Sequence, residues 1–452
     1  MAVSLYRSEL SSMLALAVPI VIAEVGWMGM GIVDTIMVGH LAESAVAIGA
    51  VSLGTILFYG VGLFGSGLSL GLDTLVSQAF GSRDIDDCHK SLLNALYFSL
   101  PLSVLLMGVL WALIPLMERS GVDPAVMRGM VPYLRTLTWS LLPLLFYFGL
   151  RRYLQSMDVV RPVTFALVSA NLVNLAGNWA LVYGHWGAPA LGVTGSAWAT
   201  FFSRVYMMAV LFVVVVQHDR RLGSGLFTVS WRPDITRVRR LMQLGFPAAA
   251  QISLETAVFA VAAWLIGRLS ADSLAGHQIA LNTVSLTFLV SLGIGSAASV
   301  RVGQALGRRD AAGAWRAGWV AIGLSTAFMG CAAVALLLFA RRIASFYSSD
   351  PAVLEVGAAL LTIAAFFQIF DGLQVVATGA LRGAGDTRTS MFCHLIGYWV
   401  FGLPLGCALC FGLGWGVRGL WMGLSAAIIG IGSALVLLWR KHTRETEFIV
   451  IR

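Results

Sequence analysis

The sequence predicts an all-α membrane protein whose twelve transmembrane helices form two six-helix lobes. Hydrophobic residues make up 58% of the 452 residues and charged residues only 12%, about half the charged fraction of a soluble protein. The apolar residues are gathered into long runs, and the second half of the chain repeats the first. Together these three observations predict a multi-spanning protein made of two similar halves.

Charged residues and Gly/Pro breaks separate twelve apolar runs, and each is long enough for a helix of ~20 residues to cross a bilayer. Several runs exceed this length, so we expect tilted helices or helices that protrude into water. The approximate ranges are 12–37, 46–80, 90–117, 126–155, 162–184, 191–217, 240–266, 276–305, 311–340, 352–380, 389–411 and 417–440.

The repeat is visible at a spacing of 228 residues, where Pro19 aligns with Pro247 and Gly39 with Gly267. After a two-residue deletion, segment 78–84 (QAFGSRD) aligns with segment 304–310 (QALGRRD). Since each half holds an even number of spans, both halves insert in the same direction, as parallel repeats.

The predicted domains are an N-lobe at 1–217, a cytoplasmic linker at 218–236 and a C-lobe at 237–452. The arginines and lysines predict the orientation. If the N-terminus is cytoplasmic, the inner loops and tails hold 22 of them and the outer loops seven, with Arg204 inside a span. Positive charge favours the cytoplasmic side, so we expect both termini there, in the inner (plasma) membrane.

Several function classes are disfavoured. The chain has no phosphate-binding Gly-x-x-x-x-Gly-Lys-Ser/Thr motif, so it is not expected to use ATP directly. Its basic residues do not form a soluble patch for nucleic acid. The sequence offers no metal or nucleophile constellation, which disfavours an intramembrane enzyme. We expect a monomer in contact with membrane lipids, with no cofactor.

Carboxylates inside the predicted spans are the most informative residues, because each costs about 2.5–3.5 kcal/mol in hydrocarbon. They are Glu24, Asp34, Asp73, Glu255 and Asp371. Glu255 and Asp371 have no obvious basic partner in their half. An unpaired acid at this depth indicates a water-filled cavity and a cation that binds reversibly. We expect both side chains to face one cavity and to share a cation.

Neutral polar residues accompany these acids. Gln368 and Gln374 flank Asp371 at three-residue steps on one broad side of a helix. Asn174 and Asn178 lie one turn apart and face the same way. The asparagines either bind a ligand or hold neighbouring helices together through hydrogen bonds.

Glu24 and Arg204 are predicted to form a structural charge pair. With a rise of ~1.5 Å per residue, Glu24 lies about 18 Å and Arg204 about 20 Å above the inner boundary. Two opposite charges at one depth, each costly alone, are expected to pair. The alternative is that Arg204 pairs with Asp34 and disables it as a cation ligand.

Segment 33–41 (VDTIMVGHL), the repeated Gln-Ala-x-Gly-x-Arg-Asp and segment 381–388 (LRGAGDTR) resemble the multidrug and toxic compound extrusion (MATE) family. The resemblance covers essentially the whole chain, and Glu255 with the 368–374 pattern is similar to the NorM-like branch. It implies two lobes that form a V-shaped central cavity, open alternately to either side. It also implies efflux of organic cations and drugs in exchange for inward Na⁺ or H⁺.

The resemblance also implies functional residues. The N-lobe cation site would comprise Asp34, Asn174, Asn178 and Thr200. The C-lobe cation and substrate site would comprise Glu255 and Asp371, with Gln278, Gln368 and Gln374 lining the substrate path. Na⁺, if it is the coupling ion, would bind at Glu255, Asp371 or Asp34. The chain departs from the family pattern in carrying Glu24 and Arg204, and in having Asn178 where a related branch has an acid.

A flippase for a lipid or a lipid-linked oligosaccharide is the alternative within transporters. A cavity that handles pyrophosphate is expected to be lined by arginine or lysine, whereas this one is acidic apart from Arg204. The sequence therefore favours a cation-coupled antiporter and leaves open both the choice between Na⁺ and H⁺ and the natural substrate.

Overall fold

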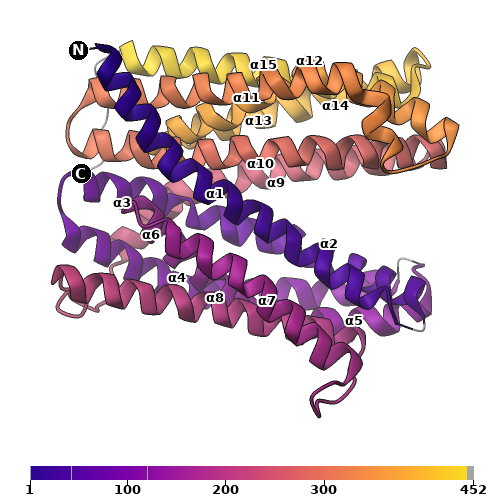
Figure 1. Cartoon of the computed structure of the whole chain (residues 1–452), viewed down its shortest axis with the longest axis horizontal. Helices are drawn as coiled ribbons and strands as arrows, with labels where there is room; N and C mark the ends of the chain where they lie inside the picture. The colour runs from indigo at the N-terminus through magenta and orange to yellow at the C-terminus, as the bar shows by residue number, and fades with distance from the viewer. Residues whose placement is uncertain (1, 42, 120, 445–452) are drawn as a thin grey trace. The chain divides into compact units, whose positions relative to one another are not determined.

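A computed structural model describes residues 2–41, 43–119 and 121–444, and all regular secondary structure within them is helical (Figure 1). The chain divides into two compact units by contacts. Unit 1 comprises Met1–Val21 and Ala250–Arg452, and unit 2 comprises Ile22–Ala249. The first helix thus begins in unit 1 and continues in unit 2. The predicted lobe boundaries at residues 217 and 237 are not tested by this division and stay a prediction.

Unit 2 contains seven complete helices between the last part of α1 and the first part of α9. The two shared helices are α1 (Ala2–Val38) and α9 (Ile235–Gly267), and the seven complete ones are α2 (Ser44–Ser69), α3 (Gly71–Gly81), α4 (Ile85–Glu118), α5 (Pro124–Thr138), α6 (Leu141–Ser156), α7 (Arg161–Tyr183) and α8 (Val193–Leu222).

Unit 1 contains the rest of α9 and the helices that follow it. They are α10 (Ala271–Gly307), α11 (Ala311–Ser345), α12 (Pro351–Gly383), α13 (Arg388–His394), the π-helical η1 (Leu395–Gly402), α14 (Leu403–Cys407), the π-helical η2 (Ala408–Gly412) and α15 (Gly416–Arg444). Segments α13 to η2 follow one another without a turn and together form one span.

The twelve predicted spans are confirmed, with one of them built in two pieces. Eleven helices in the described residues are long and apolar enough to cross a membrane. The remaining span, the fourth along the chain and predicted at 126–155, consists of α5 and α6 with a break at Trp139–Ser140. Pro143 explains the break, because its ring lacks an N–H and clashes with the carbonyl four residues earlier, that of Trp139. The chain is therefore a multi-pass membrane protein.

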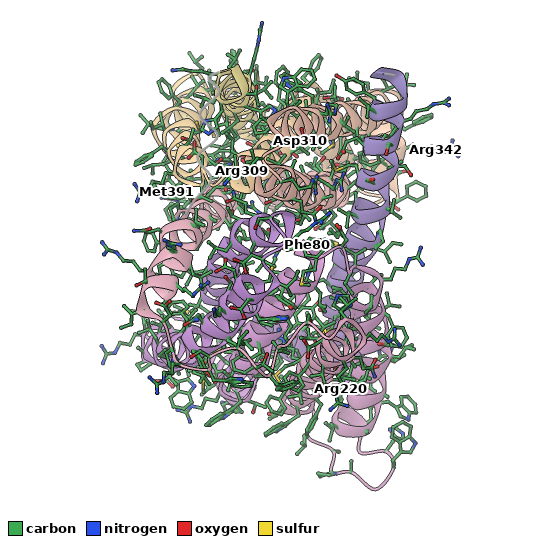
Figure 2. All side chains as sticks on the ribbon, turned by 90° about the vertical axis from the view of Figure 1, so that its left-hand side faces the viewer. Phe80, Arg220, Arg309, Asp310, Arg342 and Met391 are labelled. Atoms are coloured by element: carbon green, nitrogen blue, oxygen red, sulfur yellow. The ribbon has the colours of Figure 1, made fainter. Side chains whose placement is uncertain are left out.

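The repeated Gln-Ala-x-Gly-x-Arg-Asp motif builds the same turn in both halves. Figure 2 labels Phe80 in the first copy, and Arg309 and Asp310 in the second. Arg83 and Arg309 have left-handed backbones, with φ of 65° and 59°. The aspartate that follows each one caps the next helix: Asp84 accepts from the Asp87 N–H at 3.0 Å and Asp310 from the Gly313 N–H at 2.7 Å. The motif is thus a helix stop followed by a helix start.

In unit 1, α12 packs against α10, α11 and α15. Glycine allows the closest of these approaches: a Cβ added to Gly379 on α12 would lie 2.1 Å from the Gly295 carbonyl oxygen on α10. Small residues at such crossings are the usual basis of helix association in membranes. This packing holds the α12 polar residues in the interior of unit 1.

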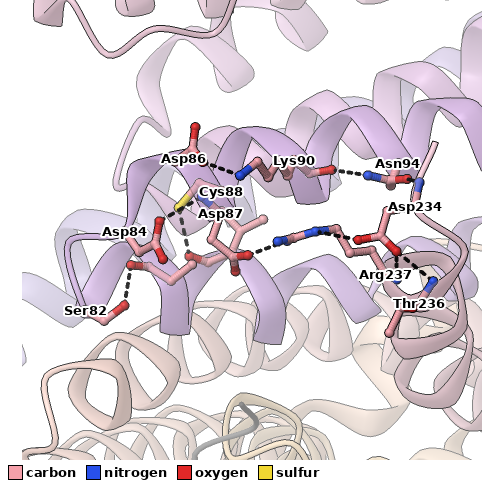
Figure 3. Close-up of polar contacts among 12 residues, drawn as sticks. Ser82, Asp84, Asp86, Asp87, Cys88, Lys90, Asn94, Asp234, Thr236 and Arg237 are labelled. Carbon is pink, nitrogen blue, oxygen red and sulfur yellow. Dashed lines mark hydrogen bonds and ion pairs between the residues drawn. The ribbon is translucent and has the colours of Figure 1, made fainter. Parts of the chain in front are cut away.

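The segment before α9 is fastened to α4 within unit 2 (Figure 3). The Asp234 N–H donates to Asn94 Oδ1 at 2.7 Å, and Arg237 forms ion pairs with Asp87 and, at 3.3 Å, with Asp234. Earlier in the segment, the Tyr97 hydroxyl donates to the Trp231 carbonyl at 2.8 Å. The segment between α8 and α9 is therefore an ordered part of unit 2.

Candidate cation and substrate sites

The predicted N-lobe residues form one cluster in unit 2. Asp34 of α1 is 6% exposed. Its Oδ1 accepts from the amide nitrogens of Asn174 at 3.0 Å and Asn178 at 2.7 Å, both on α7. Its Oδ2 accepts from the Thr200 hydroxyl of α8 at 2.8 Å. Three donors around one carboxylate stabilise its ionised form.

Two features of the helices bring this cluster together. Contacts advance in the same direction along α1 and α7, from Gly26–Asn171 at 3.0 Å to Met37–Tyr183 at 2.5 Å, so the two helices run parallel and in register. A Cβ on Gly177 would lie 3.2 Å from the Cα of Ala199, which lets α7 approach α8 closely. The asparagines therefore bind helices together and reach Asp34 at the same time.

A cavity of about 300 Å³ opens beside this cluster, between α1, α2, α5 and α8. Asp34 and Thr200 line one part of it, and Tyr59, Tyr133 and Arg204 line another. Its volume is at the lower end of the range typical of small-molecule pockets, about 300–1,000 Å³. Unit 2 thus has room for a ligand directly against the Asp34 carboxylate.

Unit 1 places Glu255 of α9 and Asp371 of α12 around a single amide. The Gln374 amide nitrogen lies 2.9 Å from Asp371 Oδ1 and 3.4 Å from Glu255 Oε1, and it also donates to the Tyr398 hydroxyl at 3.1 Å. The Glu255 side chain is 16% exposed, and Asp371 is 5% exposed with Oδ2 buried and lacking a hydrogen-bond partner. Both acids therefore lie around one amide, and the expectation that they face one cavity and share a cation stays a prediction.

Known proteins resemble this chain in both of its halves. The MatE family model matches residues 19–180 and again residues 247–407, so the two matches begin at the two prolines aligned by the internal repeat. The chain belongs to the MatE family. Members of this family are transporters, so the chain is a transporter and not an enzyme.

Similar curated proteins include "Probable multidrug resistance protein NorM" of Mesorhizobium japonicum, which is 34% identical over 98% of this chain and 96% of its own length. The protein of the same name from Brucella suis is 32% identical over 98% of this chain and 95% of its own length. Among solved structures, the eukaryotic MATE transporter AtDTX14 has a TM-score of 0.86 at 21% identity and covers 98% of this chain and 99% of its own. The structural likeness supports the MatE fold.

The predicted pairing of Glu24 with Arg204 is wrong. Glu24 instead forms an ion pair with Arg151 of α6, whose side chain is 2% exposed. Arg204 donates to the Ser140 hydroxyl at 2.5 Å and lies over the Phe58 ring at 4.5 Å from the centroid. Nor does the alternative hold, since no ion pair joins Arg204 to Asp34 among the described residues. The two side chains are predicted to lie at the same depth in the membrane. They point in different directions around their helix axes, so they contact different neighbours.

The three glutamines predicted to line the substrate path, Gln278, Gln368 and Gln374, lie in different surroundings. Gln368 is fully buried, and its amide nitrogen contacts the Thr287 hydroxyl and, at 3.3 Å, the Met329 sulfur. Gln278 is exposed on α10. Of the three glutamines, only Gln374 contacts the two carboxylates, and a substrate-lining role for the other two stays a prediction.

Sequence reasoning missed several members of these clusters. His394 lies 3.9 Å from Glu255 Oε2 through its Nε2, and Tyr398 exchanges hydrogen bonds with Gln374. Both sit in one predicted span at a spacing of four residues, which places them on one helix face and was the available signal. Arg151 and Arg152 were counted as loop residues, but Arg152 pairs with Asp73 at 3.4 Å inside unit 2.

Proposed function

We propose that the protein is a multidrug efflux antiporter that exports lipophilic organic cations in exchange for inward H⁺ or Na⁺. One observation carries this proposal. Each unit has a carboxylate cluster in its interior. Among the described residues, neither Asp34 nor Asp371 forms an ion pair with arginine or lysine. An acid kept away from water without a fixed cationic partner is suited to a cation that arrives and leaves.

Exchange requires a site that holds a positive charge in one state and releases it in another. Both clusters have free acceptor capacity for such a charge, because Asn178 Oδ1 and Asp371 Oδ2 are buried without a hydrogen-bond partner. Carboxylate, amide and hydroxyl oxygens are hard ligands of the type that alkali cations prefer. A proton, Na⁺ or the cationic group of a drug would each neutralise the same acids, which provides the competition that antiport needs.

Varied drugs are accommodated by the apolar part of the unit 2 cavity, where Met30, Ile56 and Tyr133 contribute adaptable contact area. The relatives named as multidrug resistance proteins support the same substrate class for this chain. The acidic character of both clusters supports a drug transporter over a flippase for lipid-linked pyrophosphates, which would need several cationic side chains.

The proposed location is the inner (plasma) membrane with both termini in the cytoplasm, supported by 22 basic residues on the predicted inner side against seven on the outer. The variant Ser230→Cys, made in a cysteine-free background, tests this orientation because Ser230 is exposed in the segment between α8 and α9. A membrane-impermeant maleimide is expected to label it only after the cells are opened. Labelling of intact cells would show that this segment faces the outside and that the proposed orientation is wrong.

Transport itself is tested in two steps. Expression in drug-hypersensitive cells is expected to raise the tolerated dose of ethidium, a lipophilic cation. Purified protein in proteoliposomes, with sodium and proton gradients imposed separately, then identifies the coupling ion. Ethidium movement that responds to neither gradient would exclude antiport, and movement of a fluorescent lipid alone would favour a flippase.

A further inference from the structure

A cavity of about 420 Å³ opens at one end of unit 1, where α1 and α11 begin and α15 ends. Its wall is mainly apolar, and its polar side chains are those of Tyr6, Arg316 and Thr443. The other lining residues are Leu5, Ala311, Ala312 and Trp315. All of them belong to unit 1, and none is part of either carboxylate cluster. The cavity therefore has no role in the site described above.

The α1 wall of this cavity is a fixed part of unit 1. Arg301 of α10 donates to both carboxylate oxygens of Glu9, from Nε at 2.9 Å and from Nη2 at 2.8 Å. A two-pronged contact between arginine and a carboxylate is among the strongest hydrogen-bonded pairs. Because Leu5 and Tyr6 lie one turn before Glu9, this ion pair holds them in place beside α11 and α15.

Arg316 is the charged side chain of the cavity. Among the described residues its ionic partner is Asp310, whose Oδ2 lies 3.7 Å from Nη2, farther than a hydrogen bond. Asp310 Oδ1 meanwhile caps α11 by accepting from the Gly313 N–H. Both side chains of the pair reach solvent, and such exposed pairs contribute little. The guanidinium donors of Arg316 are therefore available to an anion in the cavity.

Further positive charge surrounds this end of unit 1. Exposed basic residues follow α10 and end α15, namely Arg308, Arg309, Arg440 and Lys441. Among the described residues, the acids nearest in sequence to the cavity lining are Glu9 and Asp310, and both are already engaged. The local field therefore favours a ligand with negative charge.

An apolar row leads away from the cavity along α1. Tyr6, Leu10, Leu14 and Val18 follow one another at four-residue steps, so they lie on one side of the helix, and each is exposed. With a rise of ~1.5 Å per residue the row is about 18 Å long, slightly more than half of a hydrocarbon core of ~30 Å. Across the cavity on α11, the exposed Trp315 is of the type enriched where a membrane meets water.

We propose that this cavity binds the headgroup of an anionic phospholipid, with its phosphate on Arg316 and an acyl chain along the row from Tyr6 to Val18. A free phosphate would use only the cation, whereas a lipid uses the cation, the interfacial tryptophan and the apolar row together. The bound lipid joins α1 to α11 and adds to the attachment made by Glu9. The inference concerns a site apart from both carboxylate clusters and does not depend on the proposed efflux.

Quenching of a fluorophore on the apolar row tests this assignment. Leu10→Cys, made in a cysteine-free background, is labelled with bimane in purified full-length protein, because Leu10 is exposed and does not line the cavity. The protein is reconstituted into phosphatidylcholine vesicles with a small, equal fraction of phosphatidylglycerol or phosphatidylcholine that carries a nitroxide on the same acyl chain. We expect the binding constant from quenching to favour phosphatidylglycerol by about 10-fold, the gain typical of a charge-assisted contact.

Arg316→Gln removes the guanidinium, so phosphatidylglycerol binding is expected to fall about 10-fold, to the level of phosphatidylcholine. Arg316→Lys keeps the charge but loses the planar fork, so it should retain part of the preference. Arg440→Gln is the matched control, because Arg440 is exposed at the same end and does not line the cavity. It should keep the preference. Thermal unfolding in detergent without added lipid checks that each variant folds.

Equal quenching by the two lipids in the wild-type protein overturns the inference. An equal loss in Arg316→Gln and Arg440→Gln also overturns it, because the preference then comes from the diffuse charge of this end of unit 1. Drug export enters none of these measurements, so the inference and the proposed function stand or fail separately.

Two further arms exclude other occupants. Excess glycerol 3-phosphate should not displace the lipid, because it has no acyl chain to lie along α1. Full displacement would make the cavity a site for a soluble phosphoester and overturn the assignment. A preference for phosphatidylglycerol that appears only in a variant ending at Arg444 would assign the cavity to segment 445–452 of the chain itself, with the same consequence.

Discussion

Both units bury carboxylates, but in different surroundings. Unit 2 has the Asp34 cluster and unit 1 has the Glu255–Asp371 cluster. Asp34 is a single carboxylate with three donors from two neighbouring helices. Glu255 and Asp371 are two carboxylates that share the amide of Gln374. The first arrangement supplies one negative charge with three hydrogen-bond donors. The second brings two negative charges to one donor and favours an added positive charge.

Unit 2 also contains acids of another kind. Glu24 and Asp73 form ion pairs with the adjacent Arg151 and Arg152 of α6. These pairs are permanent parts of the packing, because each charge is balanced inside the unit. The contrast shows that the partner, more than the depth of an acid, separates a structural carboxylate from one suited to bind a mobile cation.

The largest expected effect concerns stability. Glu24→Gln leaves Arg151 buried and unpaired, so we expect a loss of about 3–5 kcal/mol in the free energy of unfolding, the usual result of breaking a buried pair on one side. The double variant Glu24→Gln with Arg151→Gln should recover much of that loss. Unfolding in detergent measures both. Glu255→Gln should leave unfolding nearly unchanged, and an equal loss there would erase the distinction between the two kinds of acid.

The next effect concerns transport. Glu255→Gln and Asp371→Asn each remove a charge from the unit 1 cluster, so gradient-driven ethidium efflux should fall roughly 100-fold, as for the loss of about 3 kcal/mol of charged interaction. Expression should stay normal. Glu355→Gln is the control, because that acid is exposed and pairs with Arg418 at 3.3 Å. Full gradient-driven transport by both variants would end the assignment of these acids to coupling.

A smaller effect is expected from making the two clusters alike. Asn178→Asp places a second carboxylate beside Asp34, as in unit 1, and removes one of its donors. We expect cation binding at this cluster to tighten about 10-fold through the added charge. Isothermal titration of Na⁺ and pH-dependent efflux measure the change. Weaker binding of every cation tested would show that the donors matter more than the charge.

The smallest effect belongs to Thr200→Val, which removes the hydroxyl that donates to Asp34 Oδ2 but keeps the side-chain volume. A neutral hydrogen bond contributes about 0.5–1.5 kcal/mol, so transport should fall roughly 2- to 10-fold. Thr362→Val on α12, whose hydroxyl donates to the Ala358 backbone carbonyl at 2.9 Å, is the matched control. Equal effects of the two substitutions would place Thr200 outside the site.

Much of the fold was predictable because it follows from one-dimensional signals. Long apolar runs define the spans, and the aligned prolines Pro19 and Pro247 define the repeat that the family model also matches. The Asp34 cluster was implied by resemblance to the family, and its geometry agrees because Asn174 and Asn178 share one face of α7.

The failures share a physical cause. Rise per residue gives the depth of Glu24 and Arg204 but not the direction in which either side chain points, and that direction decides the partner. Arg151 and Arg152 follow the pattern of a basic cytoplasmic loop, yet α6 continues to Ser156, buries Arg151 and leaves Arg152 partly buried. The four-residue spacing of His394 and Tyr398 shows that they share a helix face, but it does not show that this face turns toward Glu255 and Gln374.

During synthesis, α5 and α6 must enter the membrane as one span, although neither helix is long enough to cross alone. They have 15 and 16 residues, short of the ~20 needed to cross, and α5 carries Arg128, Arg135 and Pro132. An insertion machinery that selects segments by hydrophobicity is expected to insert this helix pair inefficiently. In the structure this pair packs against α2, α3 and α4, which are made earlier, and against α7 and α8, which are made later. We therefore expect the topology of the first six spans to be settled only when α8 emerges, so that nascent chains truncated before α8 leave this pair incompletely inserted.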